Sequence, residues 1–314
     1  MENATEQAKA NANVTALLRD CLSRHFGVTD AGFHKFVEKN CEYLDLHTGD
    51  ILIEQGDTSD DVYFLLTGRM RAMLKGANGE QIAVGEIGRG ETVGELAMFT
   101  EQRRSASVVA IRDSLAAKVT RQTLEKAMGK QPAIALAITK QVIERFRAMD
   151  EISKPPRIPV SLTFLPISDG IDIRDFVHRQ AEIRRAKGDN VIVIDDDYVH
   201  KHLGPLTGPD ISLPRGPVSI GLGELELRHD AVYHIGNPSD MPWCHTAVHH
   251  SDEVVLVADA NADPQFSDLE SLLFPGDVTM RANMTLALLQ SPDIQCPKDT
   301  AKWLAPRSVS RHQH

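Results

Sequence analysis

The sequence is poor in cysteine and contains no long hydrophobic run. Its four cysteines, at positions 21, 41, 244 and 296, include no Cys-x-x-Cys pair. This pattern argues against a disulfide framework and indicates reduced thiols, as in the cytosol. No apolar stretch approaches the roughly 18 residues of a membrane-spanning helix. The start, Met1-Glu2-Asn3-Ala4, lacks the basic-then-apolar order of a signal peptide. We therefore expect a cytoplasmic protein without a transmembrane segment.

Positive charge is also in short supply. The chain has 34 Lys and Arg against 44 Asp and Glu, which gives a net charge of −10. Phosphate backbones are bound by basic surfaces, so this balance argues against a nucleic-acid partner. A length of 314 residues exceeds one typical domain and predicts two.

The most informative segment is Gly94-Glu95-Leu96-Ala97, followed by Arg104-Ser105-Ala106. A glycine turn that leads into a helix start presents backbone N–H groups to phosphate oxygens. The carboxylate of Glu95 can accept a hydrogen bond from a ribose 2′-hydroxyl. Arg104 can form a charge-assisted contact with the single negative charge of a cyclic phosphodiester. The segment thus indicates recognition of a ribose with a cyclic phosphate.

With Arg104 seven residues after Ala97, this segment resembles the phosphate cassette of the cyclic nucleotide-binding domain family. The similarity covers about residues 44–128 and includes Gly49-Asp50, Gly56-Asp57 and the run from Tyr63 to Gly68. The resemblance implies a jelly-roll-like β-barrel with flanking helices, and cAMP or cGMP as the ligand with no other cofactor. It assigns ligand binding to Gly94, Glu95, Leu96, Ala97, Arg104, Ser105 and Ala106. It does not decide between the two bases.

Helical patterns flank the barrel and complete a domain of residues 13–150. Residues 1–12 are small and polar, and we expect them to be disordered. An apolar stripe predicts a helix over 132–149, with Ile134, Ile138, Val142, Phe146 and Met149 on one side. In the family such a helix lies across the ligand and often pairs with its twin in a homodimer. A helix packed only on its own barrel explains the stripe equally well. Residues 151–159 contain Pro155 and Pro156 and are expected to form a linker.

Beyond the linker the sequence alternates between strands and helices, which predicts a parallel sheet covered by helices over 160–290. We predict a helix over 172–187 with Ile173, Phe176, Val177 and Ile183 on one side. The five predicted strands are Val160–Leu165, Asn190–Ile194, Ala231–Ile235, Glu253–Ala258 and Met284–Leu289. The fold class is therefore α+β with several domains. No helix-turn-helix follows the sensor, which disfavours a Crp-type transcription regulator.

With the strand in Lys187–Asp195 and the pair of strands in Asp230–Ile235 and Ser251–Val257, this second domain resembles a deviant P-loop ATPase of the MinD/ParA type. The loop after its first strand, however, contains no Gly-Lys-Ser/Thr and carries Asp169 and Asp172, whose carboxylates would repel ATP. We interpret it as a degenerate scaffold without a nucleotide. Cys244, His245 and His249 have helical spacing, but two histidines on a helix are common, and no metal site is predicted. The acidic run 195–197 is interpreted as a helix cap.

The order of parts resembles the N-terminal region of bacterial patatin-like phospholipases of the neuropathy target esterase family. Residues 291–314 are expected to lead toward a hydrolase domain in cis. No serine in the chain has glycines at both −2 and +2, so no nucleophile elbow and no catalytic residue is predicted. The resemblance implies a cyclic-nucleotide-sensing regulatory region in lipid metabolism, with membrane association through the hydrolase part. A stand-alone signalling module that acts on a partner protein is the alternative.

Overall fold

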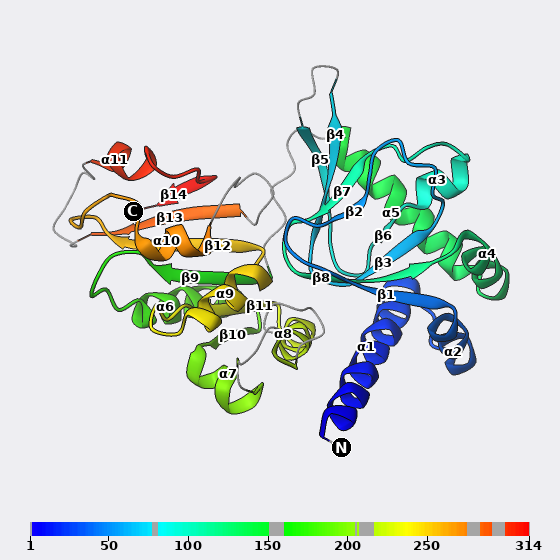
Figure 1. Cartoon of the computed structure of the whole chain (residues 1–314), viewed down its shortest axis with the longest axis horizontal. Helices are drawn as coiled ribbons and strands as arrows, with labels where there is room; N and C mark the ends of the chain where they lie inside the picture. The colour runs from blue at the N-terminus through cyan, green and yellow to red at the C-terminus, as the bar shows by residue number, and fades with distance from the viewer. Residues whose placement is uncertain are drawn as a thin grey trace. The chain divides into compact units, whose positions relative to one another are not determined.

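The computed structural model describes residues 2–76, 81–150, 160–204, 206, 217–274, 283–290 and 299–313. The described residues up to 150 belong to one compact unit, and those from 160 onward belong to a second. Figure 1 labels the helices and strands of both units. The predicted linker over 151–159 lies outside the described residues.

The first unit contains two antiparallel four-stranded sheets that enclose an apolar core, as the jelly-roll prediction requires. The strand orders are β1-β8-β3-β6 and β2-β7-β4-β5. Leu65, Met70 and Ile87 are almost completely buried between the sheets. The strands are β1 Cys41–Leu46, β2 Ile51–Ile53, β3 Val62–Thr67, β4 Met70–Lys75, β5 Gln81–Ile87, β6 Thr92–Val93, β7 Ser107–Ala110 and β8 Ser114–Val119.

Five helices accompany these sheets: α1 Glu2–Phe26, α2 Ala31–Lys39, α3 Glu95–Thr100, α4 Arg121–Lys130 and α5 Ala133–Asp150. The long helix α5 agrees with the predicted helix over 132–149. The prediction of a disordered start was wrong, because α1 begins at Glu2. Glutamate, glutamine, lysine and four alanines dominate its first turns, and all of these are strong helix formers.

The second unit is built on one six-stranded parallel sheet with the order β10-β11-β9-β12-β13-β14. The five strands predicted from the sequence are all present. The sheet consists of β9 Ser161–Pro166, β10 Val191–Ile194, β11 Ala231–Ile235, β12 Glu253–Asp259, β13 Asn283–Leu289 and β14 Arg311–Gln313.

Successive side chains of each strand point to opposite faces of this sheet, so it has two cores. Phe164 packs with α6, whereas its neighbour Leu165 packs with α9 and α10. Two tryptophans, Trp243 and Trp303, are buried on the second of these faces. The helices are α6 Arg174–Arg185, α7 Asp196–His202, α8 Pro217–Arg228, α9 Met241–His250, α10 Asp268–Leu273 and α11 Thr300–Leu304.

Two expectations for this unit need correction. Ile183 does not face the core, since 55% of it is exposed, and Ala181 is buried in its place. The expected extension after residue 290 is part of the domain, because β14 pairs with β13 and Trp303 is buried. A buried ion pair holds this segment, with Arg307 Nε donating to Glu270 Oε1 at 2.6 Å. The sequence contains no glycine turn or long apolar strand that would have revealed so short an edge strand.

Candidate functional site

The first unit contains a cavity of about 240 Å³. Its wall is formed by the start of α3, the three residues directly before β7, parts of β4 and β5, and one side of α5. All seven residues that the sequence assigned to ligand binding line this cavity: Gly94, Glu95, Leu96, Ala97, Arg104, Ser105 and Ala106.

Gly94 connects β6 to α3 with a backbone conformation that other residues rarely adopt. Its φ is +91°, and a Cβ at this position would lie 2.5 Å from Arg104 Nη1 and 2.7 Å from the Asp61 carbonyl oxygen. Only glycine combines a left-handed turn with such a close approach. The turn leaves the first N–H groups of α3, which have no partners within the helix, at the edge of the cavity.

Arg104 is buried, with 3% of its surface exposed, yet only some of the N–H groups of its guanidinium donate hydrogen bonds to the protein. Its Nη1 donates to the Gly94 carbonyl at 2.8 Å, its Nη2 to the Asp61 carbonyl at 2.7 Å, and its Nε to Ser59 Oγ at 3.1 Å. A guanidinium has five N–H donors. Within the described residues no carboxylate pairs with Arg104. A buried cation with free donors therefore lines the cavity.

Glu95 is also buried, with 1% exposed, and it uses only one of its carboxylate oxygens. Glu95 Oε1 accepts from Arg145 Nη1 at 2.9 Å. Glu95 Oε2 has no partner in the described part of the chain. Burial raises the pKa of this carboxyl above its ordinary value, and the charges of Arg145 and Arg104 oppose that rise. The open oxygen can accept a hydrogen bond from a hydroxyl in the cavity.

Helix α5 contributes Val142, Arg145 and Phe146 to the wall. Of the predicted stripe, Ile134 and Ile138 are fully buried, whereas Phe146 lines the cavity and is 53% exposed. The side chain of Met149 lies outside the described residues. Arg145 connects the helix to the cassette through Glu95, and to β6 through Nη2, which donates to the Thr92 carbonyl at 2.7 Å.

Sequence reasoning missed Arg145 and the apolar wall. Arg145 directly precedes Phe146 of the stripe, but nothing in the sequence shows that it reaches Glu95, fifty residues earlier. The alternation of apolar residues along the strands was the available signal for the wall. That wall is formed by Ile53, Ala72, Leu74, Val84, Gly85, Ile87, Val93 and Val108.

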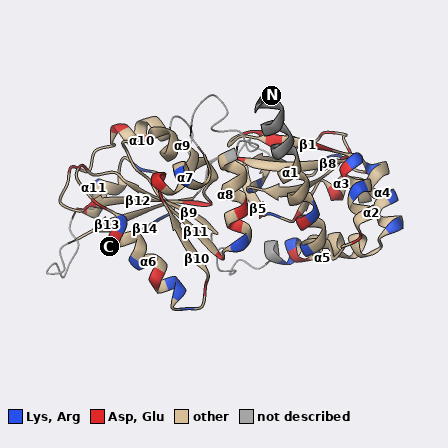
Figure 2. Ribbon diagram, turned by 90° about the horizontal axis from the view of Figure 1, so that it is seen from below, with Lys and Arg blue, Asp and Glu red and all other residues tan. Residues whose placement is uncertain are grey.

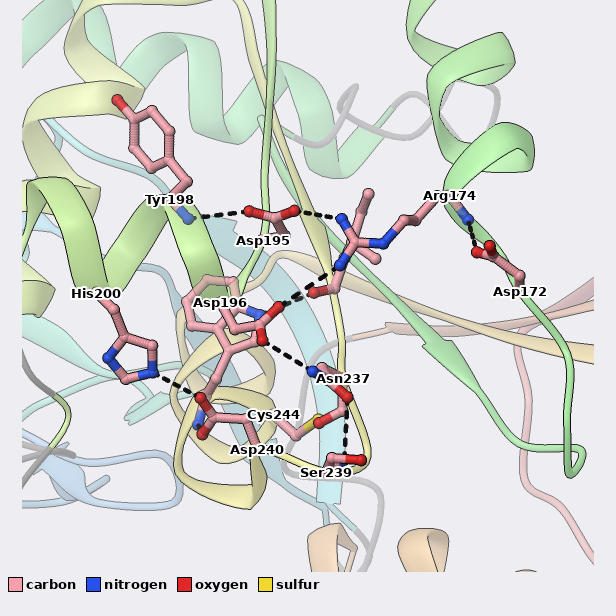
Figure 3. Close-up of polar contacts among 12 residues, drawn as sticks. Asp172, Arg174, Asp195, Asp196, Tyr198, His200, Asn237, Ser239, Asp240 and Cys244 are labelled. Carbon is pink, nitrogen blue, oxygen red and sulfur yellow. Dashed lines mark hydrogen bonds and ion pairs between the residues drawn. The ribbon is translucent and has the colours of Figure 1, made fainter.

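In the second unit, the carboxyl ends of the parallel strands carry a network of polar side chains (Figure 3). Ligands of open α/β sheets bind at this edge. Here Arg174 pairs with Asp195 and lies 3.9 Å from Asp196, which also accepts from Asn237 Nδ2 at 2.8 Å. The basic residue nearest the loop after β9 is thus neutralised by carboxylates. This arrangement offers no cation to a nucleotide phosphate within the described residues.

The motifs set aside as structural have structural partners. Asp195 caps α7 by accepting from the Tyr198 N–H at 3.0 Å, which confirms the interpretation of the acidic run. Cys244 is buried and donates to the Asn237 carbonyl, and burial raises the pKa of its thiol to about 12. His245 and His249 stack on each other with ring centroids 4.2 Å apart. In the described ranges no cluster of three or more His, Cys, Asp or Glu is placed to hold a metal ion.

None of the helices described is both long and apolar enough to span a bilayer.

The fold and the cavity of the first unit define a domain of the cyclic nucleotide-binding class, which a parallel α/β domain follows in the chain. Comparison with known families agrees. Residues 44–131 match the model of the cyclic nucleotide-binding domain, and residues 160–314 match that of the Neuropathy Target Esterase family P-loop like domain. The chain therefore carries a cyclic nucleotide-binding domain followed by the P-loop like domain of the Neuropathy Target Esterase family.

The relatives that match most of the chain include fungal lysophospholipases. The chain is 29% identical over 286 residues to lysophospholipase nte1 of Aspergillus oryzae, which covers 85% of this chain and 18% of the relative. It is 28% identical over 310 residues to lysophospholipase NTE1 of Yarrowia lipolytica, with 87% and 21% covered. The chain thus spans about a fifth of the length of these relatives. The bacterial affiliation expected from the sequence stays a prediction.

Solved structures with similar folds include a cyclic nucleotide-binding domain from Methylobacillus flagellatus. It has a TM-score of 0.40 and 20% identity, and the match covers 46% of this chain and 87% of that one. The regulatory domain of Toxoplasma gondii PKA, crystallised with cAMP, has a TM-score of 0.37 and 23% identity, with 41% and 50% covered.

Proposed function

We propose that this chain is the cyclic-nucleotide-sensing regulatory region of a lysophospholipase of the Neuropathy Target Esterase family. The observation that carries the proposal is the cavity, which two buried charged residues line. Arg104 has N–H donors that no protein group accepts from, and Glu95 Oε2 has no partner among the described residues. Buried polar groups in native proteins are almost always satisfied. A ligand that accepts from Arg104 and donates to Glu95 would satisfy both groups.

A cyclic nucleotide meets both requirements. Its phosphodiester carries one negative charge, and the cavity wall holds Arg104 and Arg145 against Glu95, a surplus of one cation when the carboxyl is ionised. The phosphate oxygens would accept from the open N–H groups of Arg104 and from the start of α3. The ribose 2′-hydroxyl would donate to Glu95 Oε2.

The base has an apolar environment. Leu74, Val84 and Val142 line the cavity, and the exposed ring of Phe146 stands at its wall. Apolar and aromatic surface stabilises a purine by burial without reading its polar edge. This wall is compatible with both cAMP and cGMP, so we propose a cyclic purine nucleotide as the ligand.

The remaining proposals concern the whole protein. Both relatives are named lysophospholipases, and the chain corresponds to a minor part of each. We infer that a patatin-type hydrolase domain in the same polypeptide is the target of regulation, and that the protein is cytoplasmic with membrane association through that part. Leu136 and Ile143 leave 73% and 47% of their surface exposed on α5, which supports a homodimer through this helix.

Calorimetry of the purified chain with cAMP, cGMP and 5′-AMP tests the ligand. We expect both cyclic nucleotides to bind and 5′-AMP, with its extra charge and open phosphate, to bind more weakly. Failure of both cyclic nucleotides at millimolar concentration would overturn the proposal. An open reading frame that continues past His314 into a hydrolase domain supports regulation in cis, whereas a stop codon there favours the stand-alone module.

A further inference from the structure

The solvent side of α2 and α4 carries four exposed lysines, Lys35, Lys39, Lys126 and Lys130, which we call the lysine face. In each helix the two lysines are four residues apart and point away from the buried side. That side is formed by Phe33 and Val37 in α2 and by Leu124 and Ala127 in α4. The helices pack together, and Lys130 Nζ lies 4.1 Å from the centre of the Phe36 ring. The four lysines are therefore exposed on two helices that pack against each other.

The acidic residues of these helices are already paired with arginines. Arg19 binds Glu38 at 2.6 Å. Arg121 binds Glu125 at 2.9 Å and Glu101 at 3.0 Å. None of the four lysines forms an ion pair within the part of the chain that the structure describes. Figure 2 shows blue segments on both helices at this end of the first unit. A chain with a net charge of −10 thus concentrates unpaired positive charge on one face.

We propose that the lysine face is a docking surface for the anionic headgroups of a lipid bilayer. Lysine ammonium groups are mobile point charges that suit a diffuse anionic surface. Specific recognition of carboxylates or phosphates uses the fixed fork of arginine, and the arginines here are occupied. The choice of a membrane over an acidic protein rests on the proposed function, since a lysophospholipase acts on lipid. Docking would hold the regulatory region at the bilayer independently of the hydrolase part.

Vesicle co-sedimentation tests this proposal with the whole chain. We expect binding to phosphatidylcholine vesicles that contain phosphatidylserine and no binding to pure phosphatidylcholine. Each lysine near an anionic surface contributes about fivefold in affinity, so K39E/K126E is expected to weaken binding by at least ~20-fold. Binding is also expected to disappear in about 1 M salt, where the Debye length is about 3 Å.

The matched control is K187E/K201E, which changes the net charge equally at two exposed lysines of the second unit. This variant is expected to bind vesicles with no more than about twofold loss. Equal losses in both double variants, or binding that ignores phosphatidylserine, would overturn the proposal. Calorimetry with cAMP on the same variants separates the two proposals, because none of these lysines lines the cavity.

Discussion

At the scale of single residues, the cavity is distinguished by incomplete satisfaction of buried charge. Arg104 donates three hydrogen bonds to other residues of the protein, two of them to the carbonyls of Gly94 and Asp61. These bonds fix its orientation before any ligand arrives. A pre-oriented cation loses little side-chain entropy on binding, which favours a small anionic ligand.

Replacing Arg104 with alanine is expected to weaken cyclic nucleotide binding by at least ~30-fold, because an unpaired charge in a buried site costs about 2 kcal/mol or more. Arg104→Lys keeps the charge but loses the fork, and is expected to recover only part of the affinity. Calorimetry with cAMP and cGMP measures both. Unchanged affinity in Arg104→Ala would show that the phosphate lies elsewhere.

Glu95 is expected to act through the ribose. Glu95→Gln leaves only a neutral acceptor, and 2′-deoxy-cAMP lacks the donor hydroxyl. Each change should weaken binding by about tenfold, since the charge-assisted hydrogen bond is lost in both cases. The two changes together should cost little more than either alone, because they remove the same contact. Additive losses would show that Glu95 does not touch the sugar.

Gly94→Ala should destabilise the first unit by about 1–3 kcal/mol, because it forces a side chain into a left-handed backbone conformation and against Arg104. Gly129→Ala is the control, since Gly129 lies in α4 with no atom within 4 Å of an added Cβ. There alanine is expected to stabilise by up to ~1 kcal/mol.

Tryptophan fluorescence reports only on the second unit, so it can show whether the effect of Gly94→Ala is confined to the first. Both Trp243 and Trp303 belong to the second unit, and the sequence has no others. In urea unfolding, Gly94→Ala should therefore shift the transition followed by circular dichroism but leave the transition followed by tryptophan fluorescence in place. A shift in fluorescence alone would contradict the assignment of strain to the cassette.

At the scale of elements, α5 is the part of the first unit best placed to report ligand binding. It lines the cavity with Val142 and Phe146, and it bonds to the cassette through Arg145. Gln141 adds a second connection, since its Oε1 accepts from the Thr92 N–H at 2.9 Å. A ligand shifts such an element only if it binds two positions of the helix with different affinity.

Cyclic nucleotide is expected to slow amide exchange over 94–107 and to change it over 134–149 and the 153–157 linker, while the parallel sheet beyond 160 stays unaffected. At saturating ligand, Arg145→Ala should remove the response of α5, whereas Arg147→Ala, an exposed arginine on the same helix, should preserve it. Hydrogen-exchange mass spectrometry distinguishes the outcomes. Protection confined to 94–107 in the wild type would show that α5 is not a relay.

Elements with a strong local pattern could be predicted from the sequence. The strands β9 to β13 are apolar runs bounded by polar turns, and the cassette combines a glycine turn with a fixed spacing to Arg104. Features that depend on tertiary context could not. The exposure of Ile183, the pairing of Arg145 with Glu95 and the edge strand β14 are set by what packs against them. The start of α1 was a different error, since its residues already favoured a helix.

At the scale of the whole molecule, the candidate ligand cavity and the parallel α/β sheet belong to two different units, and the charged groups at the two candidate sites differ. The cavity of the first unit presents cationic donors from Arg104. At the strand ends of the second unit, carboxylates contact the nearby basic side chains. Arg174 forms an ion pair with Asp195, and His200 Nε2 lies 2.7 Å from an oxygen of Asp240. We therefore expect an anionic nucleotide to bind the first unit and not the second.

The purified chain is expected to hydrolyse neither esters nor ATP above a heat-inactivated control. Serine hydrolysis needs a nucleophile held in a strand–turn–helix elbow beside an oxyanion hole, and no serine in the sequence has the flanking glycines of that turn. ATP hydrolysis needs a lysine and an amide cradle on the phosphates, and the loop after β9 offers Asp169 and Asp172 instead.

A nitrophenyl ester assay, a phosphate-release assay and labelling with a fluorophosphonate probe measure these activities independently. A longer polypeptide that includes a hydrolase domain serves as the positive control for the first and the third. Turnover by the present chain that survives repeated purification would refute its assignment as a purely regulatory region. Labelling of one serine would in addition identify a nucleophile that lacks the glycine elbow, and the second unit would then have to be treated as an enzyme.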